Sequence, residues 1–303
     1  MTAFEPFSFK ECLPPRSHSA LSPILHVKPK QNSEVLLLRL LSGTLDLKNN
    51  TTGILINQRN NYTLFDFRPN QRISATVILN VFSIDGISEA KVFNYYKECF
   101  KFGNRNLFKN LLLELSNYFY QTQKKSHATA FLHLYRSFEL ISYCFPLFYA
   151  SKSTSYEKTF ISLKEYFSKA DGERPFFKKF VHDHLFASDL RLDQTLPIKI
   201  TAPKPELQKQ YFDALKRLCD ANSNIDVKSA TPNIEIVISR KGLTSLIIDL
   251  RNRYFHLLTG DFNDNFSSGE LAEIDQCFVL LNDIILNWLS VIYFQIVKKT
   301  ISP

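Results

Sequence analysis

Glycine is scarce in this sequence, and none of it stands in a phosphate-binding loop. Only 8 of the 303 residues are glycine, and no GxxxxGK spacing occurs. Nucleotide hydrolysis at such a loop is therefore not supported. The GxSxG serine elbow is also missing, which argues against a hydrolase of that kind.

Cysteine is sparse too, and its five copies are widely spaced. An odd number of cysteines without a CxxC pair or a Cys/His cluster supports neither a disulfide framework nor a zinc site. Cys144 and Cys277 fall in apolar helical stretches and are predicted to be reduced core residues. The loop that begins at Asp261 has Phe266 and Ala272 where a calcium loop requires glycine and glutamate. We expect no metal and no cofactor.

The sequence has no long apolar run free of polar residues. Its most apolar stretch, 278–297, contains Asp283, and an aspartate alone costs about 3 kcal/mol at the centre of a bilayer. A buried bundle helix therefore explains this stretch better than a membrane span. The N-terminus lacks a basic start followed by an apolar segment, so no signal peptide is expected. The sequence predicts a cytoplasmic protein that does not contact a membrane.

Positive charge is in excess, since Lys and Arg number 37 against 29 Asp and Glu. The formal net charge is +8 and the pI is near 9.1, which suits an acidic partner such as nucleic acid without identifying one. Hydrophobic content of 45% with 22% charged residues is typical of a soluble globular chain. At this length the chain can hold one large domain or two.

The N-terminal third has the texture of β-structure. Residues 1–33 contain several prolines and are expected to be irregular. From residue 34 to residue 84, strand-like runs alternate with asparagine-rich turns. We expect a β-rich N-terminal domain over residues 1–87, containing a small antiparallel sheet. Its expected strands are 44–48, 53–56, 62–67 and 74–82.

After Gly86 the hydrophobic period becomes that of a helix, which predicts a helical domain over residues 88–303. The stretch 196–206 contains three prolines and interrupts the helices, so residues 151–235 are interpreted as an insertion. The expected fold class is mainly α, and α+β for the chain as a whole. The expected helices are 88–101, 104–123, 127–150, 155–168, 173–187, 205–220, 240–259 and 269–298.

The most informative segment is Leu250–His256, inside the helix expected over 240–259. Arg251 is followed by Asn252, and His256 comes five positions after the arginine. RNA supplies its own nucleophile, the ribose 2′-OH. A metal-free nuclease then needs a proton-transfer group with a pKa near 7 and a fixed positive charge for the phosphate. Histidine and arginine meet these two needs.

The helix that carries this segment has two apolar stripes. Ile248 and Phe255, seven residues apart, lie opposite the stripe that faces a core. A second copy of the chain or another helix of the same chain is expected to cover them, and we predict them as a dimer seam. Arg251 and His256 lie about 140° apart on an ideal helix, so one phosphate reaches both only if the helix ends or kinks between them or a symmetric partner completes the site. The core stripe comprises Leu243, Leu246, Ile247, Leu250, Tyr254, Leu257 and Leu258.

Arg251-Asn252-x-x-x-His256 resembles the signature of the HEPN superfamily, in which an arginine and a polar residue precede a histidine by a short gap. The segment 132–140 is similar to the early helix of that domain, where an acidic residue often supports the arginine. The resemblance covers residues 104–299. It implies an HEPN-like all-helical bundle, a homodimer with a composite active site, and metal-independent RNA cleavage, often in antiviral or toxin systems.

Each residue of the motif has an expected role. His256 moves the proton, Arg251 stabilises the charge that develops on phosphorus, and Asn252 positions the phosphate or the imidazole. Glu139 has two interpretations that stay open. It orients Arg251, or it is a surface carboxylate paired with Arg136 three residues earlier on the same helix.

Further basic residues are candidates for contact with RNA. Arg253 flanks the motif, and Lys178 and Lys179 lie on a basic helix face that also carries His182 and His184. These two histidines are not expected to bind a metal, because side chains i and i+2 of a helix point about 200° apart.

The leading interpretation is a homodimeric endoribonuclease that cleaves RNA by attack of the 2′-OH, as an antiviral or toxin effector. A sensor or inhibitory partner protein, the N-terminal domain or the 151–235 insertion is expected to restrain it, because a free nuclease is toxic. The alternative is a non-catalytic HEPN-like module that binds nucleotide or protein, and a third interpretation is an interaction scaffold. In the plainest interpretation, Arg251 and His256 belong to a solvated last turn, where cations favour the helix dipole.

Overall fold

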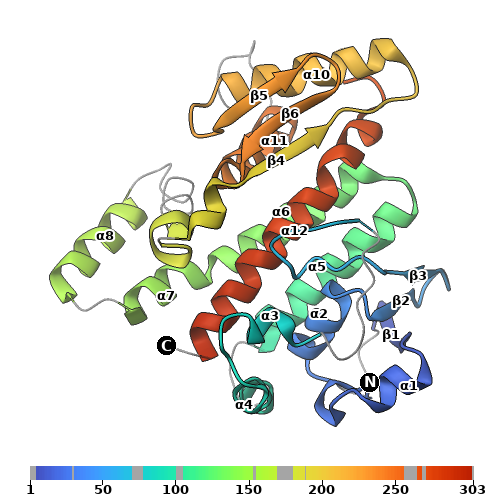
Figure 1. Cartoon of the computed structure of the whole chain (residues 1–303), viewed down its shortest axis with the longest axis vertical. Helices are drawn as coiled ribbons and strands as arrows, with labels where there is room; N and C mark the ends of the chain where they lie inside the picture. The colour runs from blue at the N-terminus through green and yellow to red at the C-terminus, as the bar shows by residue number, and fades with distance from the viewer. Residues whose placement is uncertain are drawn as a thin grey trace. The chain divides into compact units, whose positions relative to one another are not determined.

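The computed structural model of this chain is mainly helical in the parts it describes, with two three-stranded antiparallel sheets (Figure 1). The expected fold class, mainly α and α+β as a whole, is confirmed at this level. The residues described are 5–28, 31–69, 78–99, 105–152, 155–168, 180–187, 189–255, 265–267 and 271–301.

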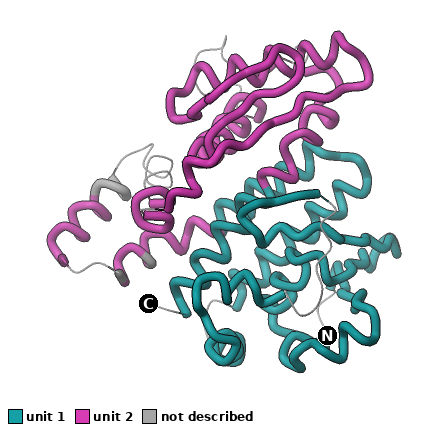
Figure 2. Tube along the Cα trace, in the orientation of Figure 1, with its two compact units in different colours: residues 1–140, 286–303 teal, residues 141–285 magenta. Residues whose placement is uncertain are grey.

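The chain divides into two compact units (Figure 2). Unit 1 comprises residues 1–140 and 286–303, and unit 2 comprises residues 141–285. Two helices, α6 (His127–Ser142) and α12 (Ile274–Ile301), contribute residues to both units. The division expected at residue 87 differs from this one and stays a prediction.

Unit 1 holds a sheet with the strand order β1-β2-β3. In its register Phe9 lies opposite Leu47, and Leu47 lies opposite Ile56. Leu47 is fully buried, and α2 packs against both β2 and α5. Besides its parts of α6 and α12, the elements of unit 1 are β1 (Phe7–Glu11), α1 (Pro15–Ser19), the 3-10 turn η1 (Pro23–Leu25), α2 (Ser33–Leu41), β2 (Leu45–Asn49), β3 (Leu55–Asn57), α3 (Asn80–Ser83), α4 (Glu89–Cys99) and α5 (Arg105–Gln123).

Helix α2 corrects the sequence prediction, which placed β-structure from residue 34 onwards. Its apolar run is nearly continuous, so hydrophobic period alone does not separate a buried helix from a buried strand. The residues at the two ends of the segment favour a helix over a strand. Asn32 Oδ1 accepts a hydrogen bond from the Glu34 N–H at 2.8 Å, which caps the first turn. Gly43 (φ 73°) ends the helix, where the Thr44 N–H donates to the Arg39 carbonyl at 3.0 Å.

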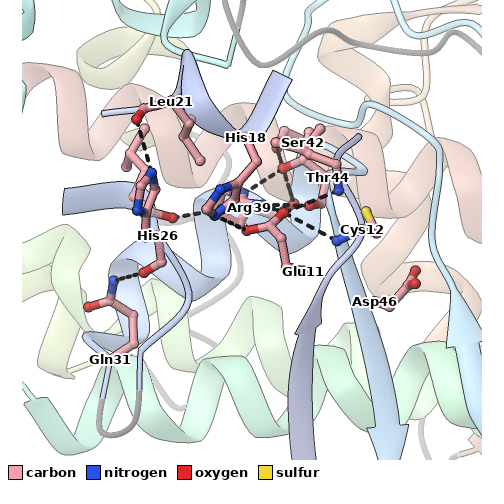
Figure 3. Close-up of polar contacts among 12 residues, drawn as sticks. Glu11, Cys12, His18, Leu21, His26, Gln31, Arg39, Ser42, Thr44 and Asp46 are labelled. Carbon is pink, nitrogen blue, oxygen red and sulfur yellow. Dashed lines mark hydrogen bonds and ion pairs between the residues drawn. The ribbon is translucent and has the colours of Figure 1, made fainter. Parts of the chain in front are cut away.

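A fully buried arginine, Arg39, ties the N-terminal elements together (Figure 3). Its Nε donates to Thr44 Oγ1 at 2.9 Å, and its Nη1 donates to the Leu25 carbonyl at 2.6 Å. Its Nη2 donates to Glu11 Oε1 and to the Thr44 carbonyl. His18 Nε2 lies 3.4 Å from Glu11 Oε2, the other carboxylate oxygen. A buried charge is tolerated when it is paired and hydrogen-bonded. Through Arg39 and Glu11, this network connects β1, α1 and η1, which lie in residues predicted to be irregular.

The other strand predictions for the N-terminal third are partly wrong. The runs 44–48 and 53–56 correspond to β2 and β3. The run 62–67 forms no strand, and the end of the run 74–82 forms α3 instead. Residues 70–77, including the start of that last run, lie outside the described residues.

Unit 2 contains a sheet that the sequence prediction missed, with strand order β4-β6-β5. Pro197 suggested an interruption, yet it sits in β4 opposite Val237. Proline lacks a backbone donor and is tolerated on an edge strand, which β4 is. Helix α10 packs on β5, β6 and α11 (Figure 1). The elements of unit 2, besides its parts of α6 and α12, are α7 (Cys144–Lys152), α8 (Tyr156–Ser168), the π-helical turn η3 (Phe180–Leu185), the 3-10 turn η4 (Leu190–Asp193), β4 (Thr195–Lys199), α10 (Pro205–Asp220), β5 (Val227–Thr231), β6 (Glu235–Ser239), the 3-10 turn η5 (Arg240–Gly242) and α11 (Leu243–Phe255).

The helix predictions agree with the structure within a few residues, with two corrections. The helix expected over 127–150 is broken at Tyr143 into α6 and α7. Pro146 lies in the first turn of α7, where its missing N–H costs no helical bond, and the same residue would disrupt a continuous helix. Of the helix expected over 173–187, only 180–187 are described, and they begin with the π-helical turn.

The cysteines are all free. Cys277 is 3% exposed, and burial raises the pKa of its thiol to about 12, so it is a core thiol as predicted. Cys144 is only half-buried. Cys277 belongs to α12, which is long and apolar enough to cross a membrane by composition, but 78% of its most apolar 18-residue window is buried in the protein.

Candidate functional site

Helix α11 passes from a buried first half to a half-buried second half. The predicted core stripe is confirmed for its first four members, each at most 2% exposed. Thr244 and Ser245 are buried as well, so the helix begins enclosed on all sides. Polar side chains reach solvent from Asp249 onwards, and Arg251, Asn252 and Arg253 are half-buried. The motif therefore stands where this helix meets the surface.

Arg251 and Asn252 are in direct contact. Arg251 Nη1 donates to Asn252 Oδ1 at 3.2 Å. Neighbouring residues on a helix project about 100° apart, so the long arginine side chain must curve towards the shorter asparagine. The bond fixes the guanidinium beside the amide. The Asn252 amide nitrogen is a second donor on the same surface, next to the charge.

His256, the predicted proton-transfer residue, lies outside the described residues, as do Leu257 and Leu258. In the sequence His256 follows Phe255, the last described residue of α11. After the undescribed segment 256–264, the Phe266 N–H donates to the Arg253 carbonyl at 3.0 Å. The described residues on either side of that segment therefore meet at the last turn of α11.

The second apolar stripe is covered at least in part by the chain itself. Ile248, predicted in the dimer seam, is 2% exposed in the single chain. The Phe255 ring packs 4.5 Å from Tyr254 and 6.5 Å from Phe278 of α12, between ring centroids. Burial, and then the Asp275 carboxylate, raises the pKa of Tyr254. Of the two expected covers, another helix of the same chain is thus present, and a dimer contact through the exposed part of Phe255 stays a prediction.

A carboxylate that the sequence analysis did not single out lies two residues before the motif. Asp249, half-buried on α11, accepts a hydrogen bond from Asn222 Nδ2 in the loop after α10. Helical periodicity places Asp249 near Arg253 on the surface of α11, which offered a signal for it. The hydrogen bond with Asn222 joins residues 27 positions apart, and no sequence pattern predicted it.

Arg136 and Glu139 belong to unit 1, and Arg251 belongs to unit 2. Support of Arg251 by Glu139 therefore stays a prediction. Arg136 pairs with Glu114 of α5, with Nη2 and Oε1 2.8 Å apart. That partner was not anticipated from the sequence. Glu139 itself is exposed.

The remaining basic candidates are only partly described. Lys178 and Lys179 lie outside the described residues. His184, on η3, packs its ring 4.6 Å from that of Tyr149 and 5.9 Å from that of Phe180. Aromatic packing is thus one role of this histidine. Among the residues the structure places, no three His, Cys, Asp or Glu side chains form a group able to hold a metal ion.

Comparison with known proteins adds no relative. No protein-family model, curated protein or solved structure matches this chain.

Proposed function

We propose that this protein is an HEPN-like, metal-independent endoribonuclease of the kind that serves in antiviral defence or as a toxin. The observation that carries the proposal is the Arg251–Asn252 pair. It is hydrogen-bonded and half-buried near the end of a helix whose first half is enclosed. His256 comes one residue after the last described position of that helix.

The pair offers a positive charge and hydrogen-bond donors, which the transition state of phosphodiester cleavage requires. The Arg251 guanidinium is a fixed positive charge with several N–H donors, and Nη1 donates to Asn252 Oδ1. Partial burial strengthens the attraction of the Arg251 charge for a phosphate. A donor already held in place loses little entropy when the transition state forms, so its contribution is made mainly to the rate.

In this proposal His256 carries out the proton transfers. The imidazole removes the proton from the ribose 2′-OH while the 2′-oxygen bonds to phosphorus. The bond from phosphorus to the 5′-oxygen breaks, and that oxygen takes a proton from an imidazolium, either the same one or that of a symmetry-related copy. The products are a 2′,3′-cyclic phosphate and a 5′-hydroxyl. Arg251 stabilises the extra negative charge on the pentacovalent phosphorus.

The test is incubation of the full chain with mixed RNA in EDTA. Cleavage that persists in chelator and disappears in His256→Ala and Arg251→Ala supports the proposal, since each such group contributes about 10²- to 10⁴-fold. Asn252→Ala is expected to be milder. Lys209→Ala, which removes an exposed cation from α10 of the same unit, is the matched control. RNA or nucleotide binding without cleavage would instead indicate the non-catalytic module, and neither would indicate a scaffold.

A further inference from the structure

A buried carboxylate in unit 1 holds two side chains that can bind an anion. Glu114, in the middle of α5, is 8% exposed. Its Oε1 lies 2.8 Å from Arg136 Nη2, and its Oε2 lies 2.8 Å from His133 Nδ1. Both partners come from α6. Because they are three residues apart on one helix, their Cβ atoms are about 5–6 Å apart on one face.

The carboxylate fixes how the imidazole is used. An ionised carboxylate only accepts hydrogen bonds, so His133 donates through Nδ1–H. Its Nε2 then makes no hydrogen bond to any residue that the structure places, and the side chain is 18% exposed. A carboxylate that orients an imidazole in this way leaves the second ring nitrogen for another group.

Arg136 is held by one nitrogen and is otherwise open. Its side chain is 63% exposed, against 11% for Glu114. An ion pair with so exposed a partner adds little to the free energy of unfolding, so stability alone does not account for the arginine. The guanidinium keeps N–H donors for a second partner, and guanidinium donors match the geometry of phosphate.

We infer that His133 and Arg136, positioned by Glu114, form a phosphate-binding site in unit 1, separate from the Arg251 motif. The trio has no net charge while His133 is neutral and one positive charge when it is protonated. Glu114 from α5 and Arg136 from α6 are the charged groups that make up its surroundings among the described contacts. An anion bound there accepts hydrogen bonds from the Arg136 guanidinium, whose positive charge adds to the attraction.

The ligand class is a phosphate group, which arrives free, on a nucleotide or in an RNA backbone. The experiment follows the histidine side-chain NMR signals of the full chain, with His133 assigned by His133→Gln. Three probes are added in turn: inorganic phosphate, a 5′-mononucleotide, and a fully 2′-O-methylated RNA oligonucleotide that the proposed mechanism does not cleave. A shift of the His133 signal with all three identifies a small-phosphate site, and a shift with RNA alone identifies a backbone contact.

Arg136→Gln is expected to weaken binding of the responding probe by about tenfold or more, as loss of a charged hydrogen bond predicts. Lys124→Gln removes an exposed cation of the same unit, which lies over the Tyr120 ring, and is expected to bind as the natural chain does. The inference is overturned if no probe shifts His133, or if Arg136→Gln binds as tightly as Lys124→Gln. The trio is then an ion cluster with a structural role only.

The result is independent of the ribonuclease proposal. Cleavage of natural RNA is followed separately in Arg251→Ala and in Arg136→Gln. A chain that cleaves RNA without a response at His133 contradicts the phosphate site alone. A chain whose His133 responds but which cleaves nothing contradicts the ribonuclease proposal alone.

Discussion

The backbone N–H of Phe266 donates to the carbonyl of Arg253 at 3.0 Å, and the Phe266 side chain is 4% exposed. Phe266 comes eleven residues after Phe255 in the sequence, so the described residues on either side of the segment that contains His256 meet at the last turn of α11.

Phe266→Ala is expected to weaken the contact of residue 266 with the last turn of α11. Loss of a buried phenylalanine lowers the free energy of unfolding by about 3–5 kcal/mol. A catalytic group displaced by an ångström can cost about 100-fold in rate, so RNA cleavage is expected to fall further than the folded fraction does. Phe82→Ala, a truncation of a fully buried residue in unit 1, is the control. Equal specific activities per folded molecule in the two variants would contradict this role for Phe266.

Ile248 and Phe255 are expected to behave differently, although the sequence placed both in one seam. Ile248 is buried in the single chain, so Ile248→Val is expected to cost about 0.5–1.5 kcal/mol of stability and to leave the oligomeric state unchanged. Phe255→Asp places an unpaired charge at the half-buried position and is expected to weaken a dimer.

Sedimentation equilibrium of both variants at micromolar concentration measures this difference. A natural chain that sediments as a monomer would contradict the predicted dimer. A dimer that Phe255→Asp leaves intact would place its interface elsewhere.

The sequence predicted those features of the site that depend on local period. The spacing of Leu243, Leu246, Ile247 and Leu250 specified the buried stripe of α11, because a helix repeats every 3.6 residues wherever it packs. Hydrophobic periodicity does not show which helix packs against which. The contact of Arg136 with Glu114, 22 positions earlier, therefore could not be predicted from the sequence.

The same limit explains the errors in the fold. The strand β4 was missed because Pro197 argues against a central strand, and only the sheet order shows that β4 is an edge. Helix α2 was missed because its apolar run fits either a buried strand or a buried helix. The Asn32 cap and the Gly43 turn, which do distinguish them, were in the sequence.

Glu34 gives a prediction for the dependence of stability on pH. The residue is 2% exposed, and burial raises the pKa of its carboxyl, against smaller opposing effects of its backbone hydrogen bond, Cys99 and Arg105. A raised pKa in the folded state means that folding favours the protonated form. The contribution of Glu34 to the free energy of unfolding is then largest at low pH and falls as pH rises from the ordinary pKa of glutamate through the raised one.

Glu34→Gln removes this titration and is expected to raise the free energy of unfolding at pH 8 more than at pH 5. Urea unfolding at the two values measures it. Glu89→Gln, at an exposed position at the start of α4, provides the matched loss of charge and is expected to show no such difference. Stabilisation of Glu34→Gln that is equal at both pH values would show that the Glu34 carboxyl does not titrate between them.

In the mechanism we propose, the nucleophile belongs to the RNA, and Arg251 and His256 assist it without a metal. A comparison in EDTA of the cleavage rates of one RNA oligonucleotide, in its natural form and with 2′-O-methyl groups throughout, distinguishes this mechanism from one in which water is the nucleophile. We predict that the natural RNA is cut to fragments ending in a 2′,3′-cyclic phosphate or its hydrolysed form, and that the methylated RNA stays intact. Cleavage of the methylated RNA as fast as the natural one would contradict this mechanism.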